Sequence, residues 1–272
     1  MRIDYHTITR SYFVEGCKIF TENGRSEKSG VNLLIIPKVP SLFTNFQKRL
    51  IKRTIPDPGN DESEMKKFVY DAGKALESFE LEFDDKGMPR LILNHKQILK
   101  NWLSYVVALN SEYTGERVER LIGSISCDLT DEQKLLKIIL NDFPVNELFG
   151  RDVYRIKFDS RTNTASREWA ETALGVPLVF DQHCSVRITS WYDRLQIKGI
   201  ADPVKNRSRF RIFCKEHPFD PQDILSVEQD TVYRSFDLSY MPERVESRFT
   251  VNGKTGCLYE TRISLTVNEK GL

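Results

Sequence analysis

Residues that could do acid–base or nucleophilic chemistry meet at one place in the sequence, where Asp181, His183 and Cys184 lie within four positions. A carboxylate that orients an imidazole, which activates a thiol or a water, would suit a hydrolase or a transferase. The segment is expected to be a strand, and adjacent strand residues point to opposite faces. His183 would point outward and Cys184 inward, so the two are not expected to act as a dyad.

Two carboxylates, Glu80 and Glu82, share one face of a predicted strand at a separation of about 6–7 Å. Paired carboxylates can exchange protons or bind a metal. Phe79, Leu81 and Phe83 alternate with them, so we interpret the pair as the solvent face of a half-buried strand. No metal ligands and no cofactor are predicted.

Basic side chains recur in two places. Arg207, Arg209 and Arg211 alternate along a predicted strand at 208–214 and would form a basic ribbon, which could contact a partner or protect a sheet edge. Residues 41–54 are predicted to form a basic amphipathic helix, which could cover a sheet, dock in a partner groove or lie on an anionic membrane. The candidate partner-binding residues are Arg207, Arg209, Arg211, Lys48, Arg49, Lys52 and Arg53.

Aromatic residues gather in the C-terminal part of the chain. A curved antiparallel sheet with this content could hold an apolar ligand, although aromatic side chains mostly fill cores. The residues are Phe180, Trp191, Tyr192, Tyr233, Phe236, Tyr240, Phe249 and Tyr259.

Composition limits the alternatives. The net charge of +1 gives no overall attraction to nucleic acid, and no nucleic-acid partner is expected. The sequence contains no phosphate-binding loop, dinucleotide fingerprint, zinc-protease motif or nucleophile elbow. Five widely spaced cysteines predict free thiols, and no apolar run is long enough to span a bilayer, so a cytoplasmic, bacterial-type protein is expected.

The periodicities predict an α+β fold with antiparallel sheets at both ends of the chain and a three-helix segment packed against them. Strands dominate 1–93, helices 94–149 and an antiparallel sheet 150–272, and the expected domains are 1–149 and 150–272. A hairpin is predicted over 75–93, with helices after the capping patterns at Asn94 and Thr130. A short helix is predicted through Trp169 and Leu174, and a strand over 153–158.

Three functions remain open at this point. The first is a non-catalytic adaptor, assembly component or scaffold that acts through protein contacts and could form a homo-oligomer, with peripheral membrane contact through 41–54. The alternative is a carrier of an apolar small molecule in a curved C-terminal sheet. The third is a hydrolase or transferase with a dispersed site near His183.

Overall fold

The computed structural model describes residues 11–22, 25–38, 48–54, 63–84, 88–142, 144–151, 153, 156–172, 177–188, 193–216, 220, 222–236, 242–254 and 256–269. The chain forms two compact units. Within the described residues, the first unit comprises 16–29 and 151–268, and the second comprises 11–15, 30–150 and 269.

Eleven strands hydrogen-bond in the order β5-β4-β3-β2-β1-β11-β10-β9-β8-β7-β6. The predicted fold class, with separate sheets flanking a helical segment, is therefore wrong, because strands from both ends of the chain enter one antiparallel sheet. Pairing of β1 with β11 satisfies backbone groups that would otherwise form two open edges. The strands are β1 (Tyr12–Glu22), β2 (Arg25–Lys38), β3 (Lys48–Thr54), β4 (Ser78–Phe83), β5 (Pro89–Ile92), β6 (Thr164–Thr172), β7 (Pro177–Ile188), β8 (Asp193–Ala201), β9 (Ile224–Phe236), β10 (Pro242–Gly253) and β11 (Gly256–Glu269).

The helices lie mostly between β3 and β6 in the sequence. The three helices predicted between 94 and 149 are confirmed, and an additional helix, α1, precedes β4. The helical elements are α1 (Glu64–Gly73), the 3-10 turn η1 (Lys74–Leu76), α2 (His95–Glu112), α3 (Glu116–Thr130), α4 (Glu132–Asn141), the π-type turn η2 (Asn146–Gly150) and α5 (Arg207–Glu216).

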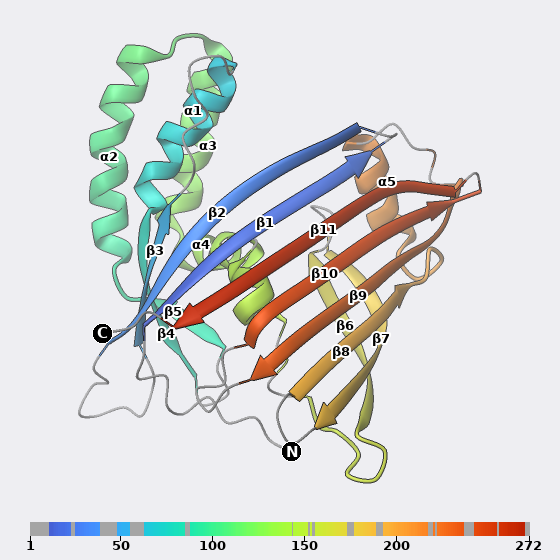
Figure 1. Cartoon of the computed structure of the whole chain (residues 1–272). Coiled ribbons are helices and arrows are strands. Elements are labelled where there is room, and N and C mark those ends of the chain that lie inside the picture. The colour runs from blue at the N-terminus through green and yellow to red at the C-terminus, as the bar shows by residue number, and fades with distance from the viewer. Residues whose placement is uncertain are drawn as a thin grey trace. The chain divides into compact units, whose positions relative to one another are not determined.

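In the second unit, α1, α2 and α3 pack beside one another (Figure 1). The buried Phe68 ring of α1 meets the Tyr113 ring edge to face at 5.4 Å. Trp102 of α2 is also buried, and its Nε1 donates to Oγ of Ser126 on α3 at 2.8 Å. These contacts bury the apolar stripe that predicted the helices.

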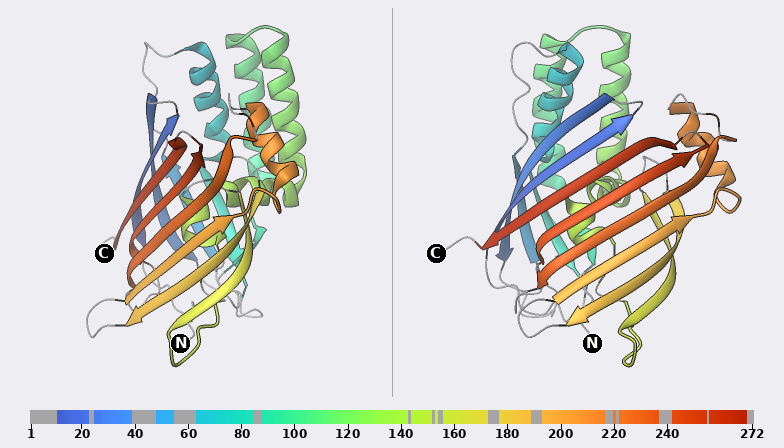
Figure 2. Two further views of the ribbon diagram at one scale, coloured as in Figure 1. Left: turned by 90° about the vertical axis from the view of Figure 1, so that its right-hand side faces the viewer. Right: turned by 45° about the vertical axis from the view of Figure 1, so that its right-hand side comes forward.

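In the first unit, β6 to β11 form an antiparallel meander that is visibly curved (Figure 2). The meander predicted from the spacing of strand patterns is confirmed. The predicted short helix through Trp169 is wrong, because this residue lies in β6, where it is paired with Phe180 of β7. The described residues of 153–158 lie outside any strand, which corrects the strand predicted there.

Two further predicted elements are corrected. Residues 207–216 form helix α5 rather than a strand, with Phe210 alone buried among its described side chains. The second half of the predicted helix 41–54 is strand β3, paired with β2 and β4, and 41–47 lie outside the described residues. In both segments the spacing of charged and apolar residues fits a helix as well as a strand. Contacts with neighbouring elements decide which of the two forms.

Candidate functional site

The buried side of β7–β11, here called the inner face, presents rows of apolar side chains. Strand register places Leu195, Tyr233, Val245 and Leu265 side by side across four strands, and none of the four is exposed to solvent. Since every second residue points to the same face, the alternation builds a continuous apolar surface.

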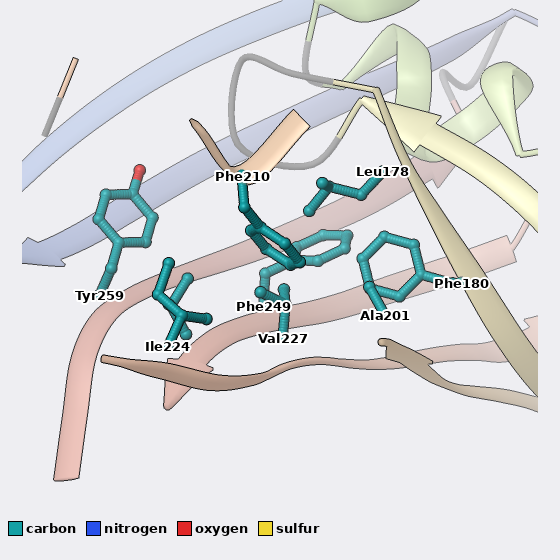
Figure 3. Close-up of a cluster of buried hydrophobic side chains, with 9 residues drawn as sticks. Leu178, Phe180, Ala201, Phe210, Ile224, Val227, Phe249 and Tyr259 are labelled. Atoms are coloured by element: carbon teal, nitrogen blue, oxygen red, sulfur yellow. The ribbon is translucent and has the colours of Figure 1, made fainter. Parts of the chain in front are cut away.

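At the end of the inner face where β9 begins, nine buried residues form an apolar cluster (Figure 3). The Phe180 and Phe249 rings pack edge to face with centroids 6.1 Å apart. Eight members come from strands and one, Phe210, comes from α5. The cluster consists of Leu178, Phe180, Ala201, Phe210, Ile224, Val227, Phe249, Val251 and Tyr259.

Helix α5 therefore covers this end of the inner face, and Phe210 makes the main contact among its described side chains. Of its described side chains, Phe210 is buried and Cys214 packs partly against the cluster, whereas Arg207, Arg211 and Lys215 are exposed. A ten-residue helix is marginal without tertiary contacts, so α5 depends on these few apolar contacts for its place.

The beginning of α5 is anchored to β7 by Asn206, which is fully buried. Its Oδ1 accepts from the Val179 amide at 2.8 Å, and its Nδ2 donates to the Val179 carbonyl at 2.9 Å. Beside it, Lys205 Nζ lies 2.8 Å from Asp181 Oδ2. Helix α5 is therefore held to β7 by polar contacts at its N-terminal end, and it packs on the cluster through apolar side chains.

A chain of hydrogen bonds crosses the inner face next to the cluster. Arg167 Nε donates to Gln182 Oε1 at 2.8 Å, and Gln182 Nε2 donates to Gln229 Oε1 at 2.7 Å. The two glutamine side chains meet over Gly199 of β8, with which both are in register. A Cβ at Gly199 would lie 2.9 Å from Gln229 Oε1, so only glycine leaves room for this bridge.

Arg151 joins the polar chain from the segment before β6. Its Nη1 donates to Thr231 Oγ1 and to Ser247 Oγ, both at 2.7 Å, and its guanidinium lies 5.2 Å from the centroid of the Phe249 ring. Arg151 is only 1% exposed. The inner face thus pairs an apolar surface with a polar belt whose members bond to one another, as buried polar groups require.

The opposite, outer face of the same strands is charged. Glu260 accepts hydrogen bonds from Arg248 and Arg262. Burial acts to raise the pKa of Glu260, but these two arginines outweigh it and hold the pKa below its ordinary value. A shallow groove of about 390 Å³ on this face is lined by Cys17, Ile19, Asp230, Val232, Arg244, Glu246, Ser247, Arg248, Arg262, Ile263 and Ser264.

The predicted partner-binding residues are divided among different environments. On α5, Arg207 and Arg211 are exposed, and Arg209 is half-buried with Nη1 3.4 Å from Asn206 Oδ1. On β3, Arg49 is 1% exposed, with its guanidinium 4.3 Å from the centroid of the Phe83 ring.

The remaining basic residues of β3 also divide by face. Arg53 shares the face of Arg49 and pairs with Asp142 at 3.2 Å, whereas Lys48 and Lys52 point to the other face. The four cations of this segment therefore form no single surface.

The predicted separation of His183 and Cys184 is confirmed. His183 is exposed and Cys184 is fully buried on the inner face. Burial raises the pKa of the Cys184 thiol, although the Arg167 charge acts against it, so the thiolate form is disfavoured. Asp181 bonds to Lys205. These residues form no acid–base pair with a nucleophile.

The two carboxylates of β4 differ from the predicted solvent-facing pair. Glu82 is 6% exposed and pairs with Arg90, whose Nη2 lies 2.6 Å from Oε1 of Glu82. Glu80 is partly exposed. In the part of the chain that the structure describes, no group of three or more histidine, cysteine or acidic residues is placed to hold a metal ion.

Half of the predicted aromatic set lies where an apolar site was expected. Phe180, Tyr233, Phe249 and Tyr259 are buried on the inner face. Trp191, Tyr192 and Tyr240 lie outside the described residues, as does the side chain of Phe236.

Sequence reasoning missed Gly199, the two bridging glutamines and the role of Phe210. A glycine inside an alternating strand was the available signal, since it indicates close approach of other groups. The described helices include none with the length and apolarity needed to cross a membrane.

Comparison with known proteins gives distant structural likenesses only. No family model matches the chain, and no curated protein matches it. It is similar to a structure that describes lipid–protein interactions in lipovitellin (10% identity, TM-score 0.39, 97% of this chain and 25% of that chain). It thus spans about a quarter of the length of that lipovitellin chain.

Two smaller proteins show likenesses over most of their length. One is a putative outer membrane lipoprotein-sorting protein domain from Vibrio parahaemolyticus (7% identity, TM-score 0.31, 98% of this chain and 89% of that chain). The other is Rv2717c from M. tuberculosis (5% identity, TM-score 0.28, 96% of this chain and 93% of that chain). With TM-scores below 0.5, none of the three assigns this chain a family or a function.

The leading hypothesis of a non-catalytic adaptor is wrong. It was motivated by two sheets rich in strand edges and aromatic residues, with no convergent polar site, and the structure has one sheet instead. The contact surfaces expected for it also differ, because 207–216 form a helix and 48–54 form strand β3. The apolar cluster and the polar belt lie instead on the inner face, where α5 covers the cluster.

Proposed function

We propose that this protein is a carrier of an apolar small molecule, which it binds on the inner face of β7–β11 beneath α5. The observation that carries this proposal is the construction of the apolar cluster. Eight of its nine members belong to a strand framework, and the ninth, Phe210, is the one buried side chain among those that the structure describes in the short helix α5. Displacement of one helix would open the surface without breaking any strand pair.

The balance of energies is compatible with such an exchange. Exposing a buried phenylalanine costs about 1.5–3 kcal/mol, and each methylene that leaves water gains about 0.8 kcal/mol. About eight methylenes of an acyl chain would therefore more than offset the exposure of Phe210. Local opening of weakly packed segments is common in binding proteins.

The polar belt supports the same proposal. The Gln182–Gln229 bridge joins two strands, and Arg151 bonds to Thr231 and Ser247 from the segment before β6, so these polar groups are satisfied by one another. An apolar ligand could thus lie on the cluster without leaving these polar groups unsatisfied, which would otherwise cost about 1–3 kcal/mol each.

Native mass spectrometry of freshly purified full chain tests the proposal. We expect a mass adduct of one apolar molecule that organic extraction removes, and one-to-one binding of a fluorescent C16 acyl probe by the extracted protein. When the probe binds, hydrogen exchange should slow in β8 and β9, quicken in α5, whose Phe210 leaves the cluster, and stay unchanged in α2 and α3. Absence of both an adduct and saturable binding would overturn the proposal, as would protection confined to α2 and α3.

The cytoplasmic location, a protein partner and a homo-oligomeric state remain predictions from the sequence. Cell fractionation tests the first, and size-exclusion chromatography with light scattering tests the other two.

A further inference from the structure

We infer that the outward face of α5 docks on an anionic membrane surface, where the protein loads or releases its ligand. This inference rests on the proposed carrier function. It begins from the division of α5 into two faces, with Phe210 directed into the apolar cluster (Figure 3) and Arg207, Arg211 and Lys215 exposed.

The charge of α5 differs from that of the whole chain. Its ten residues contain four cations, Arg207, Arg209, Arg211 and Lys215, against one acidic residue, Glu216, whereas the complete chain has a net charge of only +1. The nearby acidic side chains are engaged elsewhere. Asp181 bonds to Lys205, Asp202 accepts from the Val204 amide at 2.6 Å, and Asp220 accepts from the Gln222 amide at 2.8 Å.

Aliphatic side chains are exposed among these cations. Val204, in the turn before α5, is 83% exposed, and Ile212 within the helix is 49% exposed. Exposed aliphatic residues beside lysine and arginine are typical of surfaces that lie in the interface of an anionic bilayer. Among the described side chains of α5 no aromatic ring is exposed beside the arginines, which is a poor match for single-stranded nucleic acid, where bases stack on rings.

The proposed docking surface lies on the helix that covers the proposed ligand site. The same helix carries the docking face and the buried Phe210, and its first turn is fixed to β7 by Asn206. A bilayer that attracts the outward face can therefore draw Phe210 from the cluster at the place where an apolar ligand would enter or leave. A cation near an anionic leaflet contributes roughly fivefold in affinity, so three exposed cations predict a preference of roughly 100-fold for anionic over neutral vesicles.

Vesicle flotation of the full chain tests this inference. Vesicles of pure phosphatidylcholine are compared with vesicles that contain 30% phosphatidylglycerol, at low and at high salt. We expect binding to the anionic vesicles alone, lost at high salt because surface charges are screened. The variant R207E/R211E/K215E, which removes three cations and adds three anions, should weaken binding by more than roughly 100-fold.

A control variant changes the net charge equally on the second unit. K96E/K100E/R117E reverses three exposed cations of α2 and α3 and should bind the anionic vesicles as the wild type does. Equal binding to neutral and anionic vesicles, or equal loss in both triple variants, would overturn the inference. So would binding of the α5 face to an acidic protein in preference to anionic vesicles.

Probe transfer separates failure of docking from failure of the carrier proposal. For protein loaded with a fluorescent acyl probe, the transfer rate should rise with the concentration of anionic vesicles in the wild type and not in R207E/R211E/K215E. Saturable probe binding with a transfer rate independent of vesicle concentration overturns membrane docking alone. Vesicle binding by a chain that takes up no probe overturns the carrier proposal, and with it the loading role assigned to α5.

Discussion

Gln182 of β7 and Gln229 of β9 hydrogen-bond to each other across the intervening strand β8, with Nε2 of Gln182 2.7 Å from Oε1 of Gln229. The bridge is possible because β8 presents Gly199 between them. A Cβ there would also lie 3.2 Å from the Phe180 ring. The polar belt and the apolar cluster therefore meet at one residue without a side chain.

Replacing Gly199 by valine should destabilise the protein. The added side chain would force the two glutamines and Phe180 to shift, at a cost of about 1–3 kcal/mol. Denaturation of the full chain in urea measures the change. Gly123 on α3 offers a matched control, because a Cβ there meets nothing within 4 Å and Gly123→Ala should stabilise the helix by up to about 1 kcal/mol. Equal stability of wild type and Gly199→Val would contradict the described packing.

Substitution of the bridging glutamines should show strong coupling. Gln182→Leu removes the acceptor of Arg167 and the donor to Gln229, so it should cost about 1–3 kcal/mol, and Gln229→Leu should cost a similar amount. The double variant should cost less than the sum, since neither partner is then left unsatisfied by the other. Urea denaturation of the four proteins gives the coupling energy, and strict additivity would show that the bridge does not form.

Helices were predictable from the sequence where apolar residues keep helical spacing over several turns. α2 was predictable because Ile98, Trp102 and Leu109 repeat at helical spacing over several turns. The same spacing of Val118, Ile122 and Ile125 predicted α3. α1 was missed although Ser63 caps it, because only Phe68 and Ala72 of its ten residues are buried, whereas the equally long α4 buries three large aliphatic residues.

The site itself was predictable only in part. Strand alternation correctly placed Cys184 inside and His183 outside. It could not show that Gln182 and Gln229 meet, because their separation of 47 positions is closed only by strand register. It also could not distinguish strand from helix at 207–216, where arginines alternate with apolar residues and the contact of Phe210 with the sheet favours the helix.

Acid should weaken the contact between α1 and the residue that follows α2. Burial acts to raise the pKa of Asp71, but hydrogen bonds from Lys74 and Tyr113 outweigh it and lower the pKa below its ordinary value. A carboxyl with a lowered folded-state pKa stabilises the fold above its unfolded-state pKa, about 3.9, and that contribution disappears as the pH falls through the folded-state value.

Tyr113→Phe removes one of these hydrogen bonds while keeping the ring. The pKa of Asp71, followed by carboxyl NMR titration, should rise toward its ordinary value, and acid denaturation should lose part of its dependence on pH below about 4. An unchanged titration of Asp71 in this variant would mean that the Tyr113 hydroxyl does not bond to it in solution.

Cysteine labelling should separate buried from exposed thiols. Cys127 and Cys257 are exposed, whereas Cys184 is buried and its pKa is raised by that burial. Because the thiolate is the reactive form, iodoacetamide at pH 8 should modify Cys127 and Cys257 in the native protein and Cys184 only after denaturation. Peptide mass mapping gives the order in which the cysteines are labelled. Rapid native labelling of Cys184 would restore the hypothesis of a nucleophile in this segment.

Phe210→Ala tests whether an apolar ligand binds on the inner face beneath α5, and the affinity of the chain for a fluorescent C16 acyl probe is the measurement. Without the ring, a ligand no longer has to displace it, so the affinity should rise by at least about tenfold, equivalent to about 1.4 kcal/mol. Phe68→Ala makes the same truncation in the buried core of the second unit and controls for probe uptake by a merely destabilised protein. We expect tighter binding by Phe210→Ala and wild-type binding by Phe68→Ala. Equal affinities in all three proteins, or equal gains in both variants, would contradict it.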